Sequence, residues 1–176
     1  MTAIDDKWTQ VAWIGAPVDA GGGSAEMPEP DGRGRSRDYQ NGSIFWSPQT
    51  GAHEVHGSIR VCYARLGGTR GFLGYPVTDE TGTPDGVGRY NHFEGGSVYW
   101  TPATDSHEAH GAIRDLWASM GWERSYLGYP VSDESGSQQS SRYSPFQHGR
   151  ISWTPPGGAV AVQSQSYGDD NVGEAV

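Results

Sequence analysis

The residues best suited to chemistry fall in two motifs, and the first contains two histidines and a glutamate. It reads HEVHG at 53–57 and HEAHG at 107–111. The zinc-protease motif HExxH differs, because its histidines are four residues apart on one helix face and its glutamate acts as the base. Here the histidines are three residues apart, just before the glycine that begins a predicted helix. We expect turn or surface histidines, or a hydrogen bond at the start of that helix, and no metal site.

The second motif ends in an acidic pair, Asp79–Glu80 in one copy and Asp133–Glu134 in the other. Such pairs could accept hydrogen bonds from sugar hydroxyls, hold a hard cation, or act as general acid and base. Adjacent side chains rarely converge on one substrate. The alternative that we favour is a structural anchor, in which one carboxylate caps backbone N–H groups or pairs with the repeated Arg89 or Arg142.

No nucleophile accompanies these motifs. The sequence contains no GxSxG elbow, and the GGGS stretch at 21–24 lacks the preceding strand and the following lysine of a phosphate loop. Cys62 is the single cysteine, so an internal disulfide and a cysteine metal cage are excluded, and we expect its side chain to be buried. The sequence therefore favours binding over catalysis, with no cofactor.

Composition narrows the class of protein and of partner. Hydrophobic residues make up 34% of 176, but 27 glycines, 7 tryptophans and 9 tyrosines indicate a turn-rich aromatic fold rather than disorder. The net charge of −9 argues against a nucleic-acid partner. No apolar run is long enough to span a membrane. Residues 1–15 hold two aspartates and a lysine where a signal peptide needs an apolar stretch, which leaves the cytoplasm open as a location.

The elements that must position these motifs repeat along the chain. LGYPVTDE at 73–80 returns as LGYPVSDE at 127–134, an offset of 54 residues from position 73 to position 127. GSIFWSP at 42–48 returns as GSVYWTP at 96–102 and GRISWTP at 149–155. Internal self-similarity of this period indicates a repeat architecture.

We divide the chain into one domain, 1–156, and a polar tail, 157–176, that we expect to be mostly disordered. The domain contains three units, at about 4–56, 57–110 and 111–156. The first unit is degenerate, because IGAP stands where LGYP is expected and a Gly/Pro-rich insertion follows at 21–34.

Each unit has signals for one helix and one hairpin. Apolar residues four apart, Ile59 with Tyr63 and Ile113 with Trp117, follow one glycine and precede another, which predicts a short amphipathic helix with a glycine stop. The segment 88–100 predicts two strands joined at its glycines. The expected fold class is α+β, with tandem repeats of one short helix plus a β-hairpin around a pseudo-symmetry axis, propeller-like or pseudo-threefold.

Strand periodicity assigns the aromatic residues to faces. Trp46, Trp100 and Trp153 each share a face with an aliphatic residue, so we expect them in the core. Phe45 and Tyr99 lie on the opposite face, where an aromatic ring could stack against a sugar.

The motifs LGYPVTDE, GRYNHFEGGSVYW and GSIRVCYARLGG, in this cyclic order, resemble the LGFP repeat of actinobacterial envelope and secreted proteins. The resemblance covers nearly the whole chain up to Pro155. It implies a module that lies beside mycoloyltransferases, amidases and other hydrolases, holds them to the cell wall or assists substrate capture, and has no chemistry of its own. Two arrangements are compatible with the resemblance. The three units form the whole assembly, or they complete a ring with another chain, which would make the protein a homo-oligomer.

We predict a non-catalytic module that binds cell-wall or other envelope carbohydrate, located outside the cell or in its envelope. The alternatives are an acid–base enzyme with a histidine and carboxylates in an inter-unit groove, and a protein-interaction module. The ligand is expected in the creases between units. The predicted ligand-binding residues are Tyr75, Asp79, Glu80, Arg89, Tyr99, Tyr129, Asp133, Glu134 and Arg142.

Overall fold

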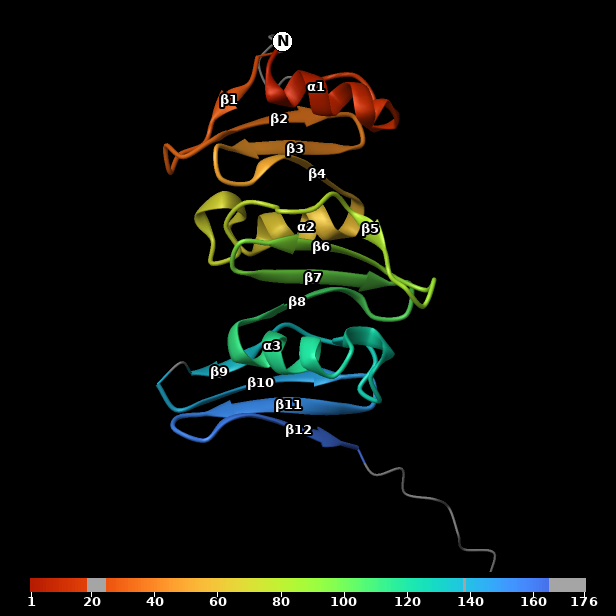
Figure 1. Ribbon diagram of the computed structural model, residues 1–176, viewed down its shortest axis with the longest axis vertical. Helices are drawn as coiled ribbons and strands as arrows, with labels where there is room; N and C mark the ends of the chain where they lie inside the picture. Colours follow the sequence, from red (N-terminus) through yellow and green to blue (C-terminus); the bar gives the residue numbers. More distant parts are fainter. Residues whose placement is uncertain (19–24, 138, 165–176) are drawn as a thin grey trace, which may run out of the picture.

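The computed structural model describes residues 1–18, 25–137 and 139–164, which form three units that follow one another along the long axis of the molecule (Figure 1). Unit 1 comprises α1 (Ala3–Gln10), η1 (Ala12–Ile14), β1 (Met27–Pro28), β2 (Arg35–Tyr39), β3 (Gly42–Ser47) and β4 (Gly51–His56). Unit 2 comprises α2 (Gly57–Arg65), η2 (Gly68–Arg70), β5 (Thr81–Gly82), β6 (Arg89–Phe93), β7 (Gly96–Thr101) and β8 (Asp105–His110). Unit 3 comprises α3 (Gly111–Ser119), η3 (Trp122–Arg124), β9 (Ser135–Ser137), β10 (Ser141–Phe146), β11 (Gly149–Thr154) and β12 (Gly158–Gln163).

The predicted α+β fold of one helix plus one hairpin is wrong. Each unit has a four-stranded antiparallel sheet, in the orders β1-β2-β3-β4, β5-β6-β7-β8 and β12-β11-β10-β9, so the chain is mostly β. The described part of the chain does not close into a propeller (Figure 1). The prediction missed β4 and β8, which contain the two HExH motifs and pair with β3 and β7, because their polar side chains indicated a turn.

Residues 158–163, assigned above to the polar tail, form β12 and pair with β11 over its whole length. The disorder predicted for the rest of the tail concerns residues 165–176, which lie outside the described residues. Residues 21–24 of the Gly/Pro-rich insertion also lie outside them.

The structure confirms the predicted helices and the apolar residues that each of them buries. Ile59 and Tyr63 are each 1% exposed, and Ile113 and Trp117 are fully buried. The glycine stop is also confirmed, since Gly67 follows α2 in the left-handed conformation with φ 99°. Each helix packs on its own sheet and also contacts the sheet of the preceding unit, where there is one.

Both faces of the central sheet are therefore covered. Val98 lies in the core of unit 2, whereas its neighbour Tyr99 lies in the core of unit 3, against Trp117 at 4.7 Å between ring centroids. Trp100 packs partly buried on the core of unit 2, as predicted. Trp46 and Trp153 pack in the same way on the cores of units 1 and 3.

The single cysteine, Cys62, is buried in the core of unit 2. Burial raises the pKa of its thiol to about 12, so the thiol is protonated and inert at neutral pH.

The tyrosine of LGYP links each unit to the one before it. The Tyr129 hydroxyl lies 2.7 Å from Oδ1 of Asp85, in the Asp–Gly turn of unit 2, and the Tyr75 hydroxyl donates to Asp31 of unit 1 at 2.8 Å. Gly88 allows the ring to approach, because a Cβ there would lie 2.8 Å from Cε1 of Tyr129. The LGYP motif therefore joins neighbouring units.

We predict that Tyr129→Phe lowers the free energy of unfolding by about 1–3 kcal/mol, because it removes a partly buried hydrogen bond to a carboxylate. Urea denaturation at 25 °C measures this. Tyr143→Phe is the control, since Tyr143 is 45% exposed, and it should change stability by less than about 0.5 kcal/mol. Equal effects of the two substitutions would show that the inter-unit bond contributes nothing.

Candidate functional site

Asp79 connects the HExH strand of unit 1 to the loop after LGYP in unit 2. Its Oδ1 accepts a hydrogen bond from the backbone N–H of Glu54 at 3.1 Å and lies 3.2 Å from Nδ1 of His53. Its Oδ2 accepts a bond from Nζ of Lys7 at 2.8 Å. Burial alone would raise the pKa of this carboxyl, but the bonds from His53, Lys7 and the N–H outweigh it and hold the pKa well below its usual value.

Asp133 repeats this arrangement between units 2 and 3. It accepts from the backbone N–H of Glu108 at 3.2 Å and lies 3.3 Å from Nδ1 of His107, and Arg65 of α2 replaces the lysine. Although burial opposes it, hydrogen bonding from His107 and Arg65 lowers the pKa of Asp133 to about 2. Both junctions therefore contain an ionised aspartate that binds a backbone N–H group, a histidine and a basic side chain.

The second histidine of each motif lies between two buried glutamates. Nδ1 of His56 is 2.8 Å from Glu54, and its Nε2 is 3.1 Å from Glu80. The side chains of these glutamates are only 2% and 5% exposed. Arg89 forms an ion pair with Glu80 from the open side of the groove.

In the second junction, His110 lies 2.7 Å from Glu108 and 3.5 Å from Glu134, and Arg142 lies 2.9 Å from Glu134. Burial lowers the pKa of His110, but hydrogen bonding and attraction to Glu108 outweigh it, so the net shift is upward. Burial raises the pKa of Glu134, against the attraction of His110 and Arg142.

The structural-anchor interpretation of the acidic pairs is thus confirmed. The aspartate caps a backbone N–H group of the preceding unit, and the glutamate pairs with the repeated arginine, as predicted for Arg89 and Arg142. Whether the exposed atoms of these groups also bind a ligand stays a prediction.

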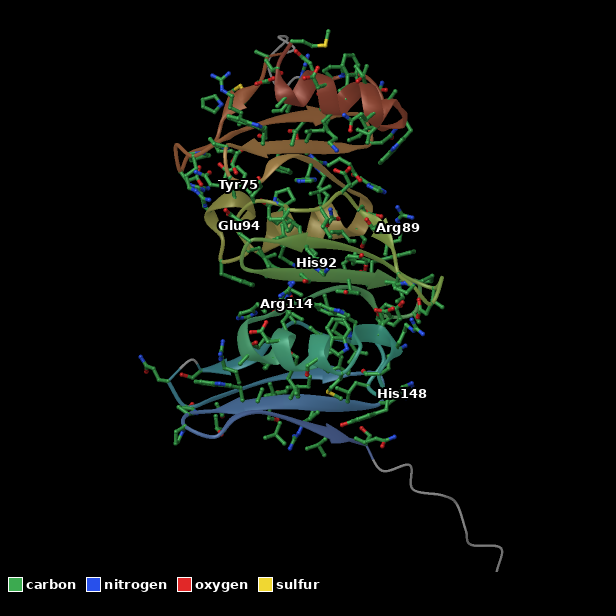
Figure 2. All side chains as sticks on the ribbon, viewed as in Figure 1. Tyr75, Arg89, His92, Glu94, Arg114 and His148 are labelled. Carbon is green, nitrogen blue, oxygen red and sulfur yellow. The ribbon has the colours of Figure 1, made fainter. Side chains whose placement is uncertain are left out.

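The three tyrosines predicted to bind ligand are buried. Tyr75, Tyr99 and Tyr129 are 0%, 3% and 4% exposed, so their rings are not available for stacking in this structure. Unit 3 covers the face of the central sheet on which Tyr99 was expected to be open, and the hydroxyl groups of Tyr75 and Tyr129 bind the preceding unit. Tyr75 and Arg89 also lie at opposite edges of the stack, so one crease does not bring all the predicted residues together (Figure 2).

Three other aromatic side chains are exposed, at the position just before the Leu–Gly or Ile–Gly of each unit. Trp13 is 52% exposed, Phe72 is 48% exposed and Tyr126 is 45% exposed. The sequence analysis above missed them. The signal that could have found them is an aromatic residue at the same place in all three copies, in a turn where the buried position is the following leucine or isoleucine.

The first of these rings shares a groove with the histidine–carboxylate network. Trp13 lies edge-on to His56, with 4.6 Å between ring centroids, and lines an open groove of about 590 Å³ with Asp79, Glu80 and Arg89. Phe72 packs on His110 with the two rings tilted, at 4.4 Å between ring centroids. Each of these two aromatic rings is thus supported by the histidine that the carboxylates hold in place.

Within the described ranges, no group of three or more histidine, cysteine, aspartate or glutamate side chains is placed to hold a metal ion. Among the helices of that part, none has the length and apolar character needed to cross a membrane.

We predict that the stability contributed by the second junction depends on pH, because the pKa of His110 is raised on folding. A histidine whose pKa is raised on folding stabilises the folded state fully below its unfolded pKa of about 6.5, and this contribution is lost as pH rises through the folded pKa. The substitution His110→Gln should therefore cost about 1–3 kcal/mol at pH 5.5, as for hydrogen bonds to charged groups, and less at pH 8.

Chemical denaturation of both proteins at the two pH values measures this difference. His148→Gln, at a loop between β10 and β11, is the matched control. An equal cost of His110→Gln at pH 5.5 and pH 8 would show that the charge of His110 does not stabilise the junction.

Comparison with known protein families gives three matches to the LGFP repeat, at residues 23–71, 73–125 and 127–169. A search of curated proteins found no match. The first two matched stretches each contain one sheet and the helix of the following unit, so the repeat as a sequence spans the junction described above. Because the three matches cover most of the chain, it belongs to the LGFP-repeat family.

Proposed function

We propose that this chain is a non-catalytic binding module for carbohydrate of the cell wall or another envelope layer. In this proposal the ligand is bound at the exposed rings of Trp13, Phe72 and Tyr126, of which Trp13 lies at the edge of Arg89 and Phe72 at the opposite edge, beside Glu94 (Figure 2). The observation that carries it is the recurrence of an exposed aromatic ring at one position of every unit.

Exposed aromatic rings suit sugars because the C–H groups on one face of a pyranose pack on a flat apolar surface. Trp13 and Phe72 are held by ring contacts with His56 and His110, so little side-chain freedom is lost on binding. A ring that is held in place in this way binds a ligand at a lower entropic cost than a mobile exposed side chain does.

Polar groups beside the first ring supply hydrogen-bonding partners for sugar hydroxyls. The Arg89 side chain is 44% exposed and can donate, and that of Asp79 is 36% exposed and can accept. An open groove with one apolar wall and a charged wall matches a polar ligand with an apolar face.

Repetition supports a polymeric ligand. A polysaccharide network that contacts rings at both edges of the stack is bound at several points at once, so weak single contacts add up to useful retention. Envelope glycans are polymers of this kind, which is why we place the protein outside the cell or in the envelope.

The geometry of the histidines favours binding over acid–base catalysis. Both ring nitrogens of His56 lie within 3.1 Å of carboxylate oxygens, so neither nitrogen faces a substrate atom. A general acid or base must reach the proton that it transfers. The proposal therefore includes binding without turnover.

We predict that insoluble actinobacterial cell wall retains the protein at physiological salt, and that single substitutions Trp13→Ala and Phe72→Ala each weaken retention. An aromatic contact is worth about 0.5–1.5 kcal/mol, or roughly twofold to tenfold in affinity. The triple variant with Tyr126→Ala should lose nearly all retention, because the contacts act together.

The control is Tyr143→Ala, which removes an equally exposed aromatic ring on a strand rather than in the turn before Leu–Gly; the counterpart of Tyr143 in unit 2, Tyr90, packs on the core of unit 3. It should bind as the wild type does. Absence of retention of the wild-type protein would reject carbohydrate binding, and release of soluble sugar during the incubation would reject the non-catalytic assignment.

A further inference from the structure

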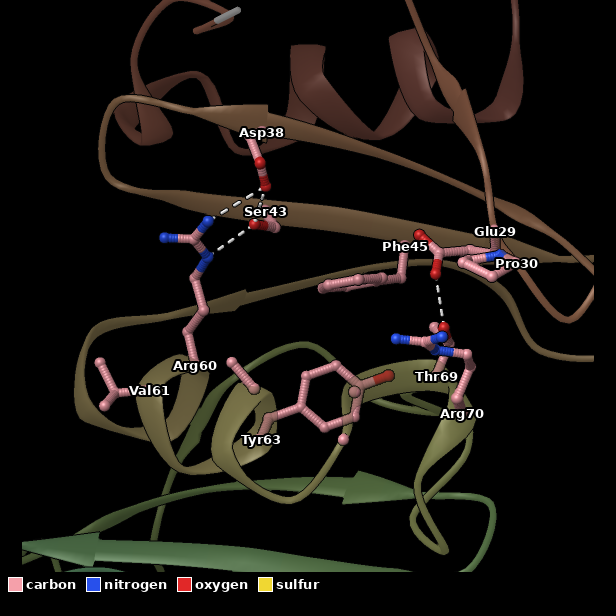
Figure 3. A pocket seen from close by; sticks show the side chains of 13 residues that line it. Glu29, Pro30, Asp38, Ser43, Phe45, Arg60, Val61, Tyr63, Thr69 and Arg70 are labelled. Carbon is pink, nitrogen blue, oxygen red and sulfur yellow. Dashed lines mark hydrogen bonds and ion pairs between the residues drawn. The ribbon is translucent and has the colours of Figure 1, made fainter. Parts of the chain in front are cut away.

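A second groove lies between units 1 and 2, away from Trp13. It has a volume of about 510 Å³ and is bounded by β3 and α2 (Figure 3). Phe45 and Tyr63 line it, in contact with each other edge to face at 5.3 Å between ring centroids, and Arg60 also lines it. A site of this size and lining suits a small molecule with an apolar ring.

The second junction has the same walls, formed by Tyr99 and Trp117, but its space is filled. The indole ring of Trp122 lies 5.8 Å from Tyr99 and 5.3 Å from Trp117, between ring centroids. The guanidinium of Arg114 lies over this indole ring at 5.2 Å, and His92 contacts it at 5.3 Å. A tryptophan of the chain thus occupies the position of the first groove.

One residue explains why the groove is open in the first junction and filled in the second. Gly68 is the counterpart of Trp122, because both follow a left-handed glycine, begin the short helix after the unit's α-helix, and have φ 57°. A Cβ on Gly68 would meet no atom within 4 Å. The first groove is therefore the space that an indole side chain fills in the second junction.

The charged group that covers the indole is already in place in the first groove. Nε of Arg60 donates to Oγ of Ser43 at 2.6 Å, as Nε of Arg114 donates to Oγ of Ser97 at 2.7 Å. This bond keeps the guanidinium oriented without a ligand, so a ring that enters the groove meets a cation in a preformed position.

One substitution at the rim changes the chemistry expected of the ligand. Asp38 in the first groove stands where the second junction has His92, and its Oδ1 lies 3.1 Å from Arg60. The carboxylate can accept a hydrogen bond from an N–H or O–H group at the edge of a bound ring. The groove therefore favours a ring that carries a donor.

We propose that this groove binds a small aromatic molecule with a ring of indole size and an N–H or O–H donor. The ring lies against Phe45 and Tyr63, under the guanidinium of Arg60, with its donor directed to Asp38. It takes the place that Trp122 takes in the second junction. This site is separate from the proposed carbohydrate groove and does not depend on it.

The test is binding of indole to the whole chain, measured by ligand-observed NMR and calorimetry. The wild type should bind one indole per chain. Gly68→Trp should weaken binding by at least about tenfold, because the added side chain fills the groove as Trp122 does. Gly68→Ala is the control, since it has the same positive φ without filling the space, and should stay within about threefold of the wild type.

The reciprocal variant, Trp122→Gly, should open a second groove and raise the stoichiometry from one indole to two. If Gly68→Trp does not fold, the stoichiometry of indole binding to Trp122→Gly tests the proposal in its place. The proposal is overturned if the wild type does not bind indole at millimolar concentration, if Gly68→Trp binds as tightly as Gly68→Ala, or if methyl glucoside displaces indole and binds more tightly. Loss of cell-wall retention without loss of indole binding would concern the carbohydrate proposal alone.

Discussion

Each junction in this stack depends on one carboxylate that binds a strand of the preceding unit. Asp79 accepts a backbone N–H bond from β4, and Asp133 accepts one from β8. A strand at the edge of a sheet presents unpaired backbone groups, which natural proteins pair or cover. Here the next unit supplies the acceptor, and a histidine and a basic side chain balance its charge. The polar edge of one sheet thereby becomes an interface instead of an exposed edge.

The same junctions explain why single units would not be stable. Tyr99 belongs by sequence to unit 2 but is buried in the core of unit 3, and Val55 of unit 1 is buried in the core of unit 2. In a repeat protein of this kind, stability is shared between each unit and its contacts with neighbours. The residues at these contacts are absent where a unit faces away from the others. Ala16 stands in unit 1 where units 2 and 3 have tyrosine, and Ala161 stands in β12 where β4 and β8 have glutamate.

Near-identical units also allow function to differ between junctions. The histidine–carboxylate network recurs with small changes in distance, which is expected of a structural device. By contrast, the groove beside α2 is open in the first junction and filled in the second, because of the change from glycine at position 68 to tryptophan at position 122. A repeat scaffold can vary such a position at little structural cost, because the walls of the groove come from conserved packing in each unit.

The sequence by itself determined the repeat, its period, the helices and the hairpins. These features are local: apolar residues four apart define a helix face, and glycines define the turns. The core positions of Trp46, Trp100 and Trp153 followed from strand periodicity in the same way. Membership of the LGFP-repeat family also rested on contiguous motifs.

Only the tertiary structure decided what the polar motifs and the aromatic residues do. The strand formed by HEVH pairs with β3 of its own unit, but its residues also bind Asp79 and Glu80, about 25 residues further along the chain, and its polar sequence lacks the apolar alternation that predicts a strand. Whether Tyr99 or Phe72 is exposed depends on which face the neighbouring unit covers, and that contact is invisible in the periodicity of a single unit. Burial between units, rather than propensity within them, therefore sets the location of the accessible rings.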